Sequence, residues 1–404
     1  MRSAPLLLAV FLLSMATASA EHAVFFFTKE ALGFGVMANL LLALVFGATY
    51  LLGARLSHPW VEWLVRRLPG VGSERFVLVL ILASQVVIGG LLAWSPTPAM
   101  FWSLWPVLGL VSGVQWPIFE SYVVAGRPPR AAATAISRFN VTWATAVVIA
   151  VAISGLLIAW WEPALFALGG LLNLAGIVIL LTTFPERAAH LEDNHPDRIP
   201  AEVVRSYRPL IASSRWSMLS SYTLMFVLGP YLPEVFDALG YGVVTATLLA
   251  GVLYALRVVS FAWMGMWPGW HGKKLPLALG AVALPVGALL ILLPSTVAPV
   301  LIGEVIFGFT AGVIYTASLY YGMIEKNASV EAGGDHEAVI GVGFCLGPLL
   351  GMAGHKLSTT LGSAVAGMTL GLSPMIVGGL VGGLWPLRKN VNHEVTKGTK
   401  EGEF

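Results

Sequence analysis

The sequence predicts an all-α membrane protein in which twelve transmembrane helices form two six-helix bundles. Composition, the lengths of the apolar runs and the placement of the basic residues each point to this class. Of the 404 residues, 57% are hydrophobic and 11% are charged, whereas soluble domains carry about 25% charged residues. The net charge is +2 and the basic residues are spread along the chain. This argues against a nucleic-acid-binding protein, which needs a concentrated basic patch.

Twelve apolar runs are long enough to cross a hydrocarbon core of ~30 Å, which takes ~20 residues of helix. Backbone groups in lipid must be hydrogen-bonded within the chain, so each run is predicted to be helical. The runs cover about residues 5–27, 31–53, 76–94, 100–123, 133–160, 163–183, 209–232, 240–265, 275–294, 297–322, 337–355 and 361–386.

The placement of the basic residues predicts the orientation of these helices. If Met1 lies in the cytoplasm, nineteen Lys and Arg residues fall in cytoplasmic loops and tails, against Lys29 and Lys356 in the outer loops. Two more, Arg138 and Arg257, lie within predicted helices. This excess on one side satisfies the positive-inside rule. We therefore expect a multi-pass protein of the inner or plasma membrane with both termini in the cytoplasm.

Residues 1–20 also have the features of a cleavable signal peptide, with one Arg, an apolar stretch and the sequence Ala18-Ser19-Ala20. However, apolar residues resume directly afterwards and continue to Phe27, so this run is long enough to span. Its removal would leave eleven predicted helices. We therefore predict that residues 1–20 are retained in the first transmembrane helix.

The longest segment between helices, residues 184–208, is charged and contains proline, and it is predicted to be a solvated cytoplasmic linker. It divides the chain into an N-terminal bundle (1–183) and a C-terminal bundle (209–388). Residues 389–404 are polar and are predicted to form a cytoplasmic tail.

An internal repeat supports this division into halves. Residues 30–36 read EALGFGV and residues 237–243 read DALGYGV, and each opens the second helix of its half. A second pair, residues 109–114 (GLVSGV) and 308–313 (GFTAGV), lies in the fourth and tenth helices. Small residues four apart allow a neighbouring helix to approach closely. Two matches at corresponding places indicate two related halves.

Three segments resemble the major facilitator superfamily. Residues 25–57 look like its outer turn and second helix, and residues 135–143 (AISRFNVTW) are similar to the start of its fifth helix. Residues 343–351 (GFCLGPLLG) carry the G-x-x-x-G-P-x-x-G pattern of its eleventh helix. The resemblance implies the fold of that family, and it also implies transport of a small solute by alternating access and function as a monomer.

The family's basic loop, G-x-x-x-D-R-x-G-R-K, is only partly present. Between the eighth and ninth helices, Gly269 stands where Asp is usual, and no Asp is in place between the second and third helices. This departure argues against an inner gate built on the usual Asp–Arg contacts. The matching residues are Gly53, Arg66, Arg67, Gly265, Gly272, Lys273 and Lys274.

Polar residues inside the predicted helices are the candidates for binding solute or protons, because a charge at mid-bilayer costs about 2.5–3.5 kcal/mol. The resemblance implies that the first, fourth, seventh and tenth helices line a central cavity, and three carboxylates lie on these helices. The candidate residues are Glu21, His22, Gln115, Trp116, Glu120, Arg138, Asn140, Tyr222, Arg257, Glu304 and Tyr315.

Several candidates have structural alternatives. Glu120 and Arg138, near the cytoplasmic ends of neighbouring helices, are predicted to form a structural or gating ion pair. Arg257 either pairs with a carboxylate or helix end, or contacts the solute. Glu304 has no basic residue on its helix and is predicted to take part in coupling or solute binding. Glu21 and His22 face either the cavity or the membrane interface.

Residues 335–337 (DHE) resemble a metal-binding cluster, but adjacent residues of a helix point in different directions. We interpret them as the cap and first turn of the eleventh helix. The sequence therefore predicts no metal site and no cofactor.

The function predicted is secondary transport of a small solute, with proton coupling and facilitated diffusion both open. A buried carboxylate would accept a proton readily. The alternatives are a transporter-like sensor or lipid-handling protein, and then an intramembrane enzyme. An enzyme is disfavoured because no G-x-S-x-G, H-E-x-x-H, Walker or C-x-x-C pattern occurs. Substrate and direction of transport stay open.

Overall fold

The computed structural model describes residues 3–68, 72–124, 126–127, 129–188, 201–292, 296–325 and 330–388. Every regular element within these ranges is a helix, which confirms the predicted all-α class. Residues 189–200 of the predicted linker and the predicted tail, 389–404, lie outside the described ranges.

Each half of the described chain contains six long helical segments. In the N-terminal half, α1, the π-helix η1 and α2 follow one another without a break, so we count them as one segment. This half comprises α1 (Ser3–Ala18), η1 (Ser19–Ala23), α2 (Val24–Leu32), α3 (Val36–Arg67), α4 (Glu74–Trp94), α5 (Pro98–Val124), α6 (Pro129–Trp160) and α7 (Ala164–Thr183). The short α8 (Ala201–Ser206) precedes the C-terminal half, which comprises α9 (Arg208–Ala238), α10 (Val243–Met266), α11 (Leu275–Leu292), α12 (Val297–Glu325), α13 (Val330–Leu361) and α14 (Ala364–Leu384).

Eleven of these segments are long and apolar enough to cross a membrane, and α9 is the predicted span that falls outside this group. α9 is 31 residues long, but it contains five serines and most of its residues are buried in the protein. A helix surrounded by other helices does not need an apolar surface toward lipid. The sequence therefore located α9 correctly even though its composition is more polar.

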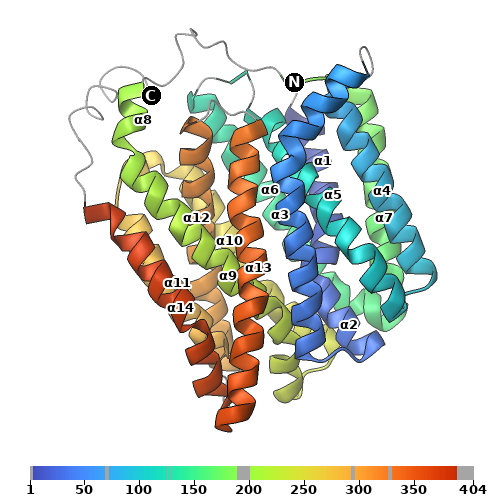
Figure 1. The fold of residues 1–404 in the computed structure, drawn as a ribbon, viewed down its shortest axis with the longest axis vertical. Coiled ribbons are helices and arrows are strands. Elements are labelled where there is room, and N and C mark those ends of the chain that lie inside the picture. Colours follow the sequence, from blue (N-terminus) through green and yellow to red (C-terminus); the bar gives the residue numbers. More distant parts are fainter. Residues whose placement is uncertain are drawn as a thin grey trace.

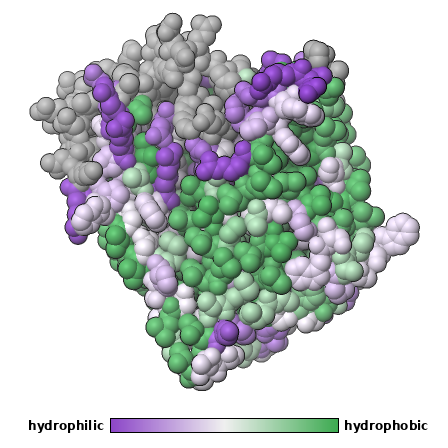
Figure 2. Space-filling model, viewed as in Figure 1, coloured by the Kyte–Doolittle hydropathy of each residue, from purple (hydrophilic) through white to green (hydrophobic). Residues whose placement is uncertain are grey.

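The outer surface matches a protein embedded in a membrane. Figure 2 shows apolar side chains over the middle of the molecule, with hydrophilic ones gathered toward its ends. Several exposed tryptophans lie in the last turns of a helix or just after it, and aromatic side chains are enriched at membrane–water interfaces. They include Trp60, Trp63, Trp94, Trp160, Trp161, Trp267 and Trp385.

The helices alternate in direction, so the bundle has two distinct ends (Figure 1). We call the end at which α1 begins and α7 ends the linker face, and the opposite end, with the α2–α3 turn, the hairpin face. The two halves meet through α3 against α13 and α6 against α10. A β-carbon on Gly47 would lie 2.6 Å from the carbonyl oxygen of Phe344, and one on Gly155 would lie 2.7 Å from that of Val243. The backbones of the halves are therefore in close contact.

Several helices extend further toward the linker face than the sequence predicted. α3 continues to Arg67, with Pro59 inside it, so Arg66 and Arg67 lie in its last turn and not in a loop. α13 begins at Val330. The interpretation of residues 335–337 as the cap and first turn is therefore wrong, because Asp335 is already five residues beyond the first residue of the helix.

The repeated turn at the hairpin face has the same backbone form in both halves. Gly33 has φ 65° and Gly240 has φ 82°, a conformation that side chains disfavour. Two residues later, Gly35 and Gly242 are extended and precede α3 and α10. The sequence repeat thus encodes a repeated helix–turn–helix geometry.

The second repeat also allows close helix packing in both halves. On α5, a β-carbon on Gly113 would lie 2.1 Å from the carbonyl oxygen of Tyr50 on α3. On α12, a β-carbon on Gly308 would lie 2.1 Å from that of Leu253 on α10. In each half the absent side chain allows the fourth segment to pack directly on the backbone of the second.

Candidate transport site

A cavity of about 70 Å³, measured as the space open to the centres of water-sized molecules, lies between the two halves. A single water needs about 10–15 Å³ by this measure, so the cavity has room for several waters. Its walls come from both halves. The lining residues are Ser14, Thr17, Ala18, Glu21, His22, Tyr50, Trp116, Glu120, Phe139, Trp143, Val147, Tyr222, Arg257, Tyr315, Glu337, Ile340 and Phe344.

Seven of the eleven residues predicted from the sequence line this cavity, and four do not. The seven come from η1, α5, α9, α10 and α12, and thus from both halves. They are Glu21, His22, Trp116, Glu120, Tyr222, Arg257 and Tyr315. The four outside the lining are Gln115, Arg138, Asn140 and Glu304.

Glu21 and His22 enter the cavity from the π-helix η1, which interrupts the first transmembrane segment. Single π-helical turns occur often at functional sites because they change the direction of the side chains around them. His22 lies 4.8 Å from Tyr254, measured between ring centroids. One carboxylate oxygen of Glu21 is buried without a hydrogen-bond partner among the described residues.

Arg257 on α10 forms the basic side of the cavity. Its side chain is 1% exposed. One Nη donates to the Tyr222 hydroxyl at 3.1 Å, and the other lies 3.6 Å from the sulfur of Met225. Its Nε has no partner within the described part of the chain.

Aromatic rings surround the Arg257 guanidinium. Its central carbon lies 4.8 Å from the ring centroid of Trp143 and 5.7–5.8 Å from those of Tyr222, Phe261 and Tyr315. Cation–π contacts stabilise a desolvated guanidinium by about 2 kcal/mol, but they do not neutralise its charge. In the described ranges no carboxylate forms an ion pair with Arg257, so it is a buried cation without an anion.

Carboxylates form the acidic side of the cavity. Glu120 on α5 and Glu337 on α13 both line it, and the Tyr50 hydroxyl donates to a Glu337 oxygen. His336, the neighbour of Glu337, is also buried. Glu337 is not among the candidates predicted from the sequence, because residues 335–337 were interpreted as the cap and first turn of the helix.

The predicted ion pair between Glu120 and Arg138 is not formed. Glu120 is 2% exposed and lies beside Glu337 and His336. Arg138 is exposed and lines a different cavity, near Leu6 and Arg127. Both residues lie near the linker face, as expected, but their side chains point to different sides.

The other three predicted residues outside the lining are packed between helices. Gln115 accepts a hydrogen bond of 2.8 Å from Gln85 on α4. Asn140 accepts one of 3.2 Å from the Trp143 indole. Glu304 on α12 is fully buried, and neither of its carboxylate oxygens has a partner among the described residues.

Helical spacing could have identified the lining face of α13. Glu337, Ile340 and Phe344 are three and four residues apart, so they share one side of the helix. Phe344 packs face to face with Phe226 at 3.6 Å between ring centroids. All three residues lie within the predicted run 337–355, so the signal was present in the sequence, but Glu337 was interpreted as a residue of the helix start and not as part of a cavity-lining face.

Ion pairs join the halves at both ends of the cavity. At the hairpin face, Lys29 on α2 lies 2.9 Å from Glu234 and 3.1 Å from Asp237, both on α9. Toward the linker face, Arg55 on α3 lies 3.2 Å from Asp335 on α13. Both sets of ion pairs connect the N-terminal half to the C-terminal half. A conformational change that opens one end of the cavity would separate the ion pairs at that end.

The sequence matches the model of the Major Facilitator Superfamily over residues 71–352. This match covers more than half of the chain, so the protein belongs to that family. No curated protein sequence matches it. Family membership points to a membrane transporter rather than an enzyme.

Solved structures of several transporters share the fold. A bacterial homologue of the human lysosomal transporter Spinster, inward-facing and unoccupied, has a TM-score of 0.66 at 14% identity and is matched over 95% of both chains. The human organic anion transporter MFSD10 has a TM-score of 0.65 at 12% identity, over 95% of this chain and 98% of that one. The nucleoside transporter NupG has a TM-score of 0.63 at 10% identity, over 96% of this chain and 100% of that one.

Proposed function

We propose that the protein is a secondary transporter that moves a small organic anion through the central cavity by alternating access. The observation that carries this proposal is Arg257, which is 1% exposed, lines the cavity and lacks a carboxylate partner in the described part of the chain. A buried charge needs a partner. An anionic group of the solute, such as a carboxylate, would provide it.

The surroundings of Arg257 suggest the rest of the solute. Trp143, Tyr222 and Tyr315 present ring faces and edges to the guanidinium, and Phe344 adds a further apolar wall to the cavity. Such walls favour a compact apolar or aromatic body over a heavily hydroxylated one. Aromatic monocarboxylates are therefore the first solutes to test.

Proton coupling forms the second part of the proposal, with Glu21 as the coupling carboxylate. Glu21 lines the cavity and has a buried oxygen without a partner among the described residues. It lies outside the group of carboxylates at α5 and α13 and enters from η1. Protonation at one end of the transport cycle and release at the other would bias the movement of the two halves.

A ligand-stabilisation screen followed by flux measurements tests this function. Aromatic carboxylates should raise the melting temperature of the purified protein, and the corresponding neutral amides should not. Arg257→Met should weaken binding at least ~30-fold, because loss of a buried charged partner costs about 2–5 kcal/mol. Arg138→Met is the matched control, since Arg138 is exposed and outside the cavity.

Three results would contradict the proposal at different levels. Equal stabilisation by acids and amides, unchanged in Arg257→Met, would exclude the anion site. A ligand that binds but shows no flux in proteoliposomes would exclude transport of that ligand and favour a sensor. Uptake with the same pH profile in Glu21→Gln would exclude Glu21 as the coupling group.

A further inference from the structure

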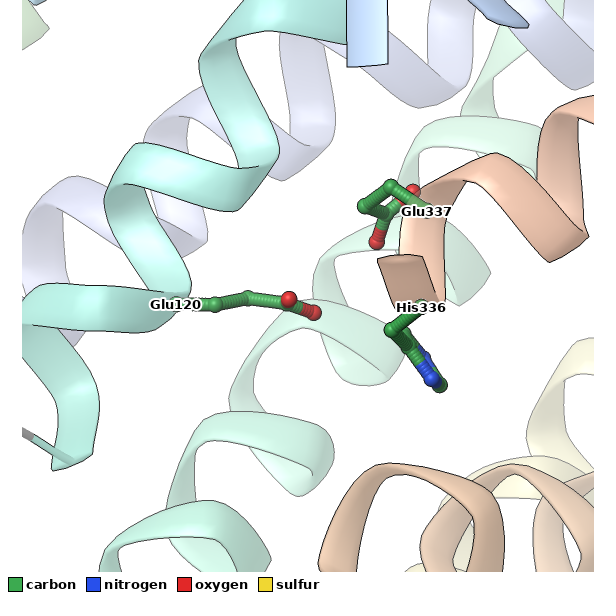
Figure 3. Close-up of side chains that lie close together, drawn as sticks. All are labelled: Glu120, His336 and Glu337. Atoms are coloured by element: carbon green, nitrogen blue, oxygen red, sulfur yellow. The ribbon is translucent and has the colours of Figure 1, made fainter. Parts of the chain in front are cut away.

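A cluster of three buried side chains lies in the acidic side of the cavity and has no role in the anion site. Glu120 extends from α5 toward α13, where His336 and Glu337 are adjacent (Figure 3). One potential ligand atom from each residue lies within 4.8 Å of the others. The three side chains are 2%, 7% and 5% exposed, respectively.

Three of the six polar side-chain atoms in this cluster lack a hydrogen-bond partner among the described residues. Both carboxylate oxygens of Glu120 and Nε2 of His336 are buried without a hydrogen bond from any described residue. No Lys or Arg among the described residues forms an ion pair with the cluster. Two carboxylates this close repel each other in a low-dielectric interior. A cation, either a metal ion or a proton, is needed to balance them.

We propose that Glu120, His336 and Glu337 bind a divalent transition-metal ion of the Zn²⁺ or Mn²⁺ type. One imidazole and two carboxylates form a donor set that suits these ions. Ca²⁺ takes six to eight oxygen ligands and Mg²⁺ prefers oxygen alone, so the imidazole disfavours both. The double positive charge would neutralise the two carboxylates.

The size of the cluster is compatible with such an ion. Ligand bonds of about 2.0–2.2 Å around a tetrahedral ion place the ligand atoms roughly 3.3 Å apart. The separations of up to 4.8 Å would close by rotation of the Glu120 side chain, whose carboxylate oxygens make no hydrogen bond to a described residue. Glu120 and Glu337 also face the cavity, so the remaining coordination position would be open to water or a solute.

Neighbouring aromatic residues hold two of the three ligands in place. The Tyr50 hydroxyl donates to Glu337, and the ring of Tyr315 packs edge-on against His336 at 5.1 Å between centroids. Partners of this kind orient ligands and raise metal affinity. Since Glu120 belongs to the N-terminal half and the other two to the C-terminal half, a bound ion would also join the halves.

Metal titration of the full-length, chelator-treated protein in detergent tests the proposal without any transport measurement. Co²⁺ should give d–d absorption bands at one ion per chain, and Zn²⁺ should displace it. Glu120→Gln, His336→Gln and Glu337→Gln should each lower the affinity at least tenfold. Glu304→Gln and His355→Gln are matched controls outside the cluster and should bind as the wild type does.

Four outcomes would overturn the metal site. The first two are the absence of Co²⁺ absorption bands at millimolar Co²⁺ and metal binding that persists in the variant with all three substitutions. The other two are binding of Ca²⁺ or Mg²⁺ as tight as that of Zn²⁺, and stabilisation of the protein by acidic pH but not by metal ions. The last result would show that the cluster binds protons only. Glu120→Gln guards against a folding artefact, because it keeps the size and shape of the side chain and replaces one oxygen of a carboxylate that makes no hydrogen bond to a described residue. If the anion-binding proposal for Arg257 is wrong, the metal titrations still test the metal site, since Arg257 takes no part in them.

Discussion

Lys29 on α2 lies 2.9 Å from Glu234 on α9, so an ion pair joins the two halves of the protein at the hairpin face. Asp237 adds a second contact at 3.1 Å. These carboxylates lie at the end of α9, beside the repeated turn that contains Gly240. Asp237 is the first residue of the repeated sequence in the C-terminal half, and Lys29 directly precedes the repeated sequence in the N-terminal half.

Lys29→Met should favour opening of the hairpin face. Partly exposed ion pairs contribute up to about 1 kcal/mol, which corresponds to a shift of roughly fivefold in the ratio of closed to open states. Spin labels at positions 34 and 241, on opposite halves, would report the shift by electron–electron distance measurements. Lys356→Met removes an exposed lysine from the same face and serves as the control. Identical distance distributions in the two variants would refute a gating role for Lys29.

Gly113→Ala and Gly308→Ala should destabilise the protein to a similar extent. Each new β-carbon would lie 2.1 Å from a backbone oxygen, so the paired helices must separate, at a cost of about 1–3 kcal/mol or more. Thermal unfolding in detergent measures the effect. Gly90→Ala in α4 is the control, because a β-carbon there meets nothing within 4 Å. Wild-type stability in Gly113→Ala would contradict the close packing of α5 on α3.

The stability of the protein should fall between pH 6.5 and pH 4 because of His271, which lies in the loop between α10 and α11. Burial lowers the pKa of His271 from 6.5 to about 4, and its ring stacks on Tyr320 at 4.3 Å. Below pH 6.5 the unfolded chain binds a proton that the folded protein does not, so acid favours unfolding by at most about 3 kcal/mol at pH 4. His271→Phe keeps the stacking and should remove this part of the pH dependence. An unchanged slope of melting temperature against pH would show that other groups cause it.

Both termini and the linker should lie in the cytoplasm. Nineteen basic residues on that side against two on the other predict this orientation. Reporter fusions after Phe404 and within residues 184–208 should both report a cytoplasmic location. A reporter active on the outer side at either position would contradict this orientation. Intact mass should show that residues 1–20 are retained, since Ser14 and Thr17 form part of the cavity wall.

The amino-acid sequence was enough to predict the fold class, the approximate positions of the twelve long helical segments and the relation between the halves. These features depend on local properties: the length of an apolar run, the spacing of small residues and the positive φ that Gly33 and Gly240 provide. The sequence also identified Arg257 and Glu120 as unusual, because charges inside apolar runs stand out without any knowledge of their neighbours.

Which of these charged groups lie close together depends on the packing of the helices in three dimensions. Glu120 and Arg138 are close along the chain, but the rotation of α5 and α6 directs Glu120 toward Glu337, more than 200 residues away. The start of α13 at Val330 brought His336 and Glu337 into the bundle, and the packing of α9 and α10 left Arg257 without a carboxylate among the residues that the structure describes. The contacts of a buried side chain depend on how its helix is rotated against helices that are distant in sequence, and composition and periodicity do not specify that rotation.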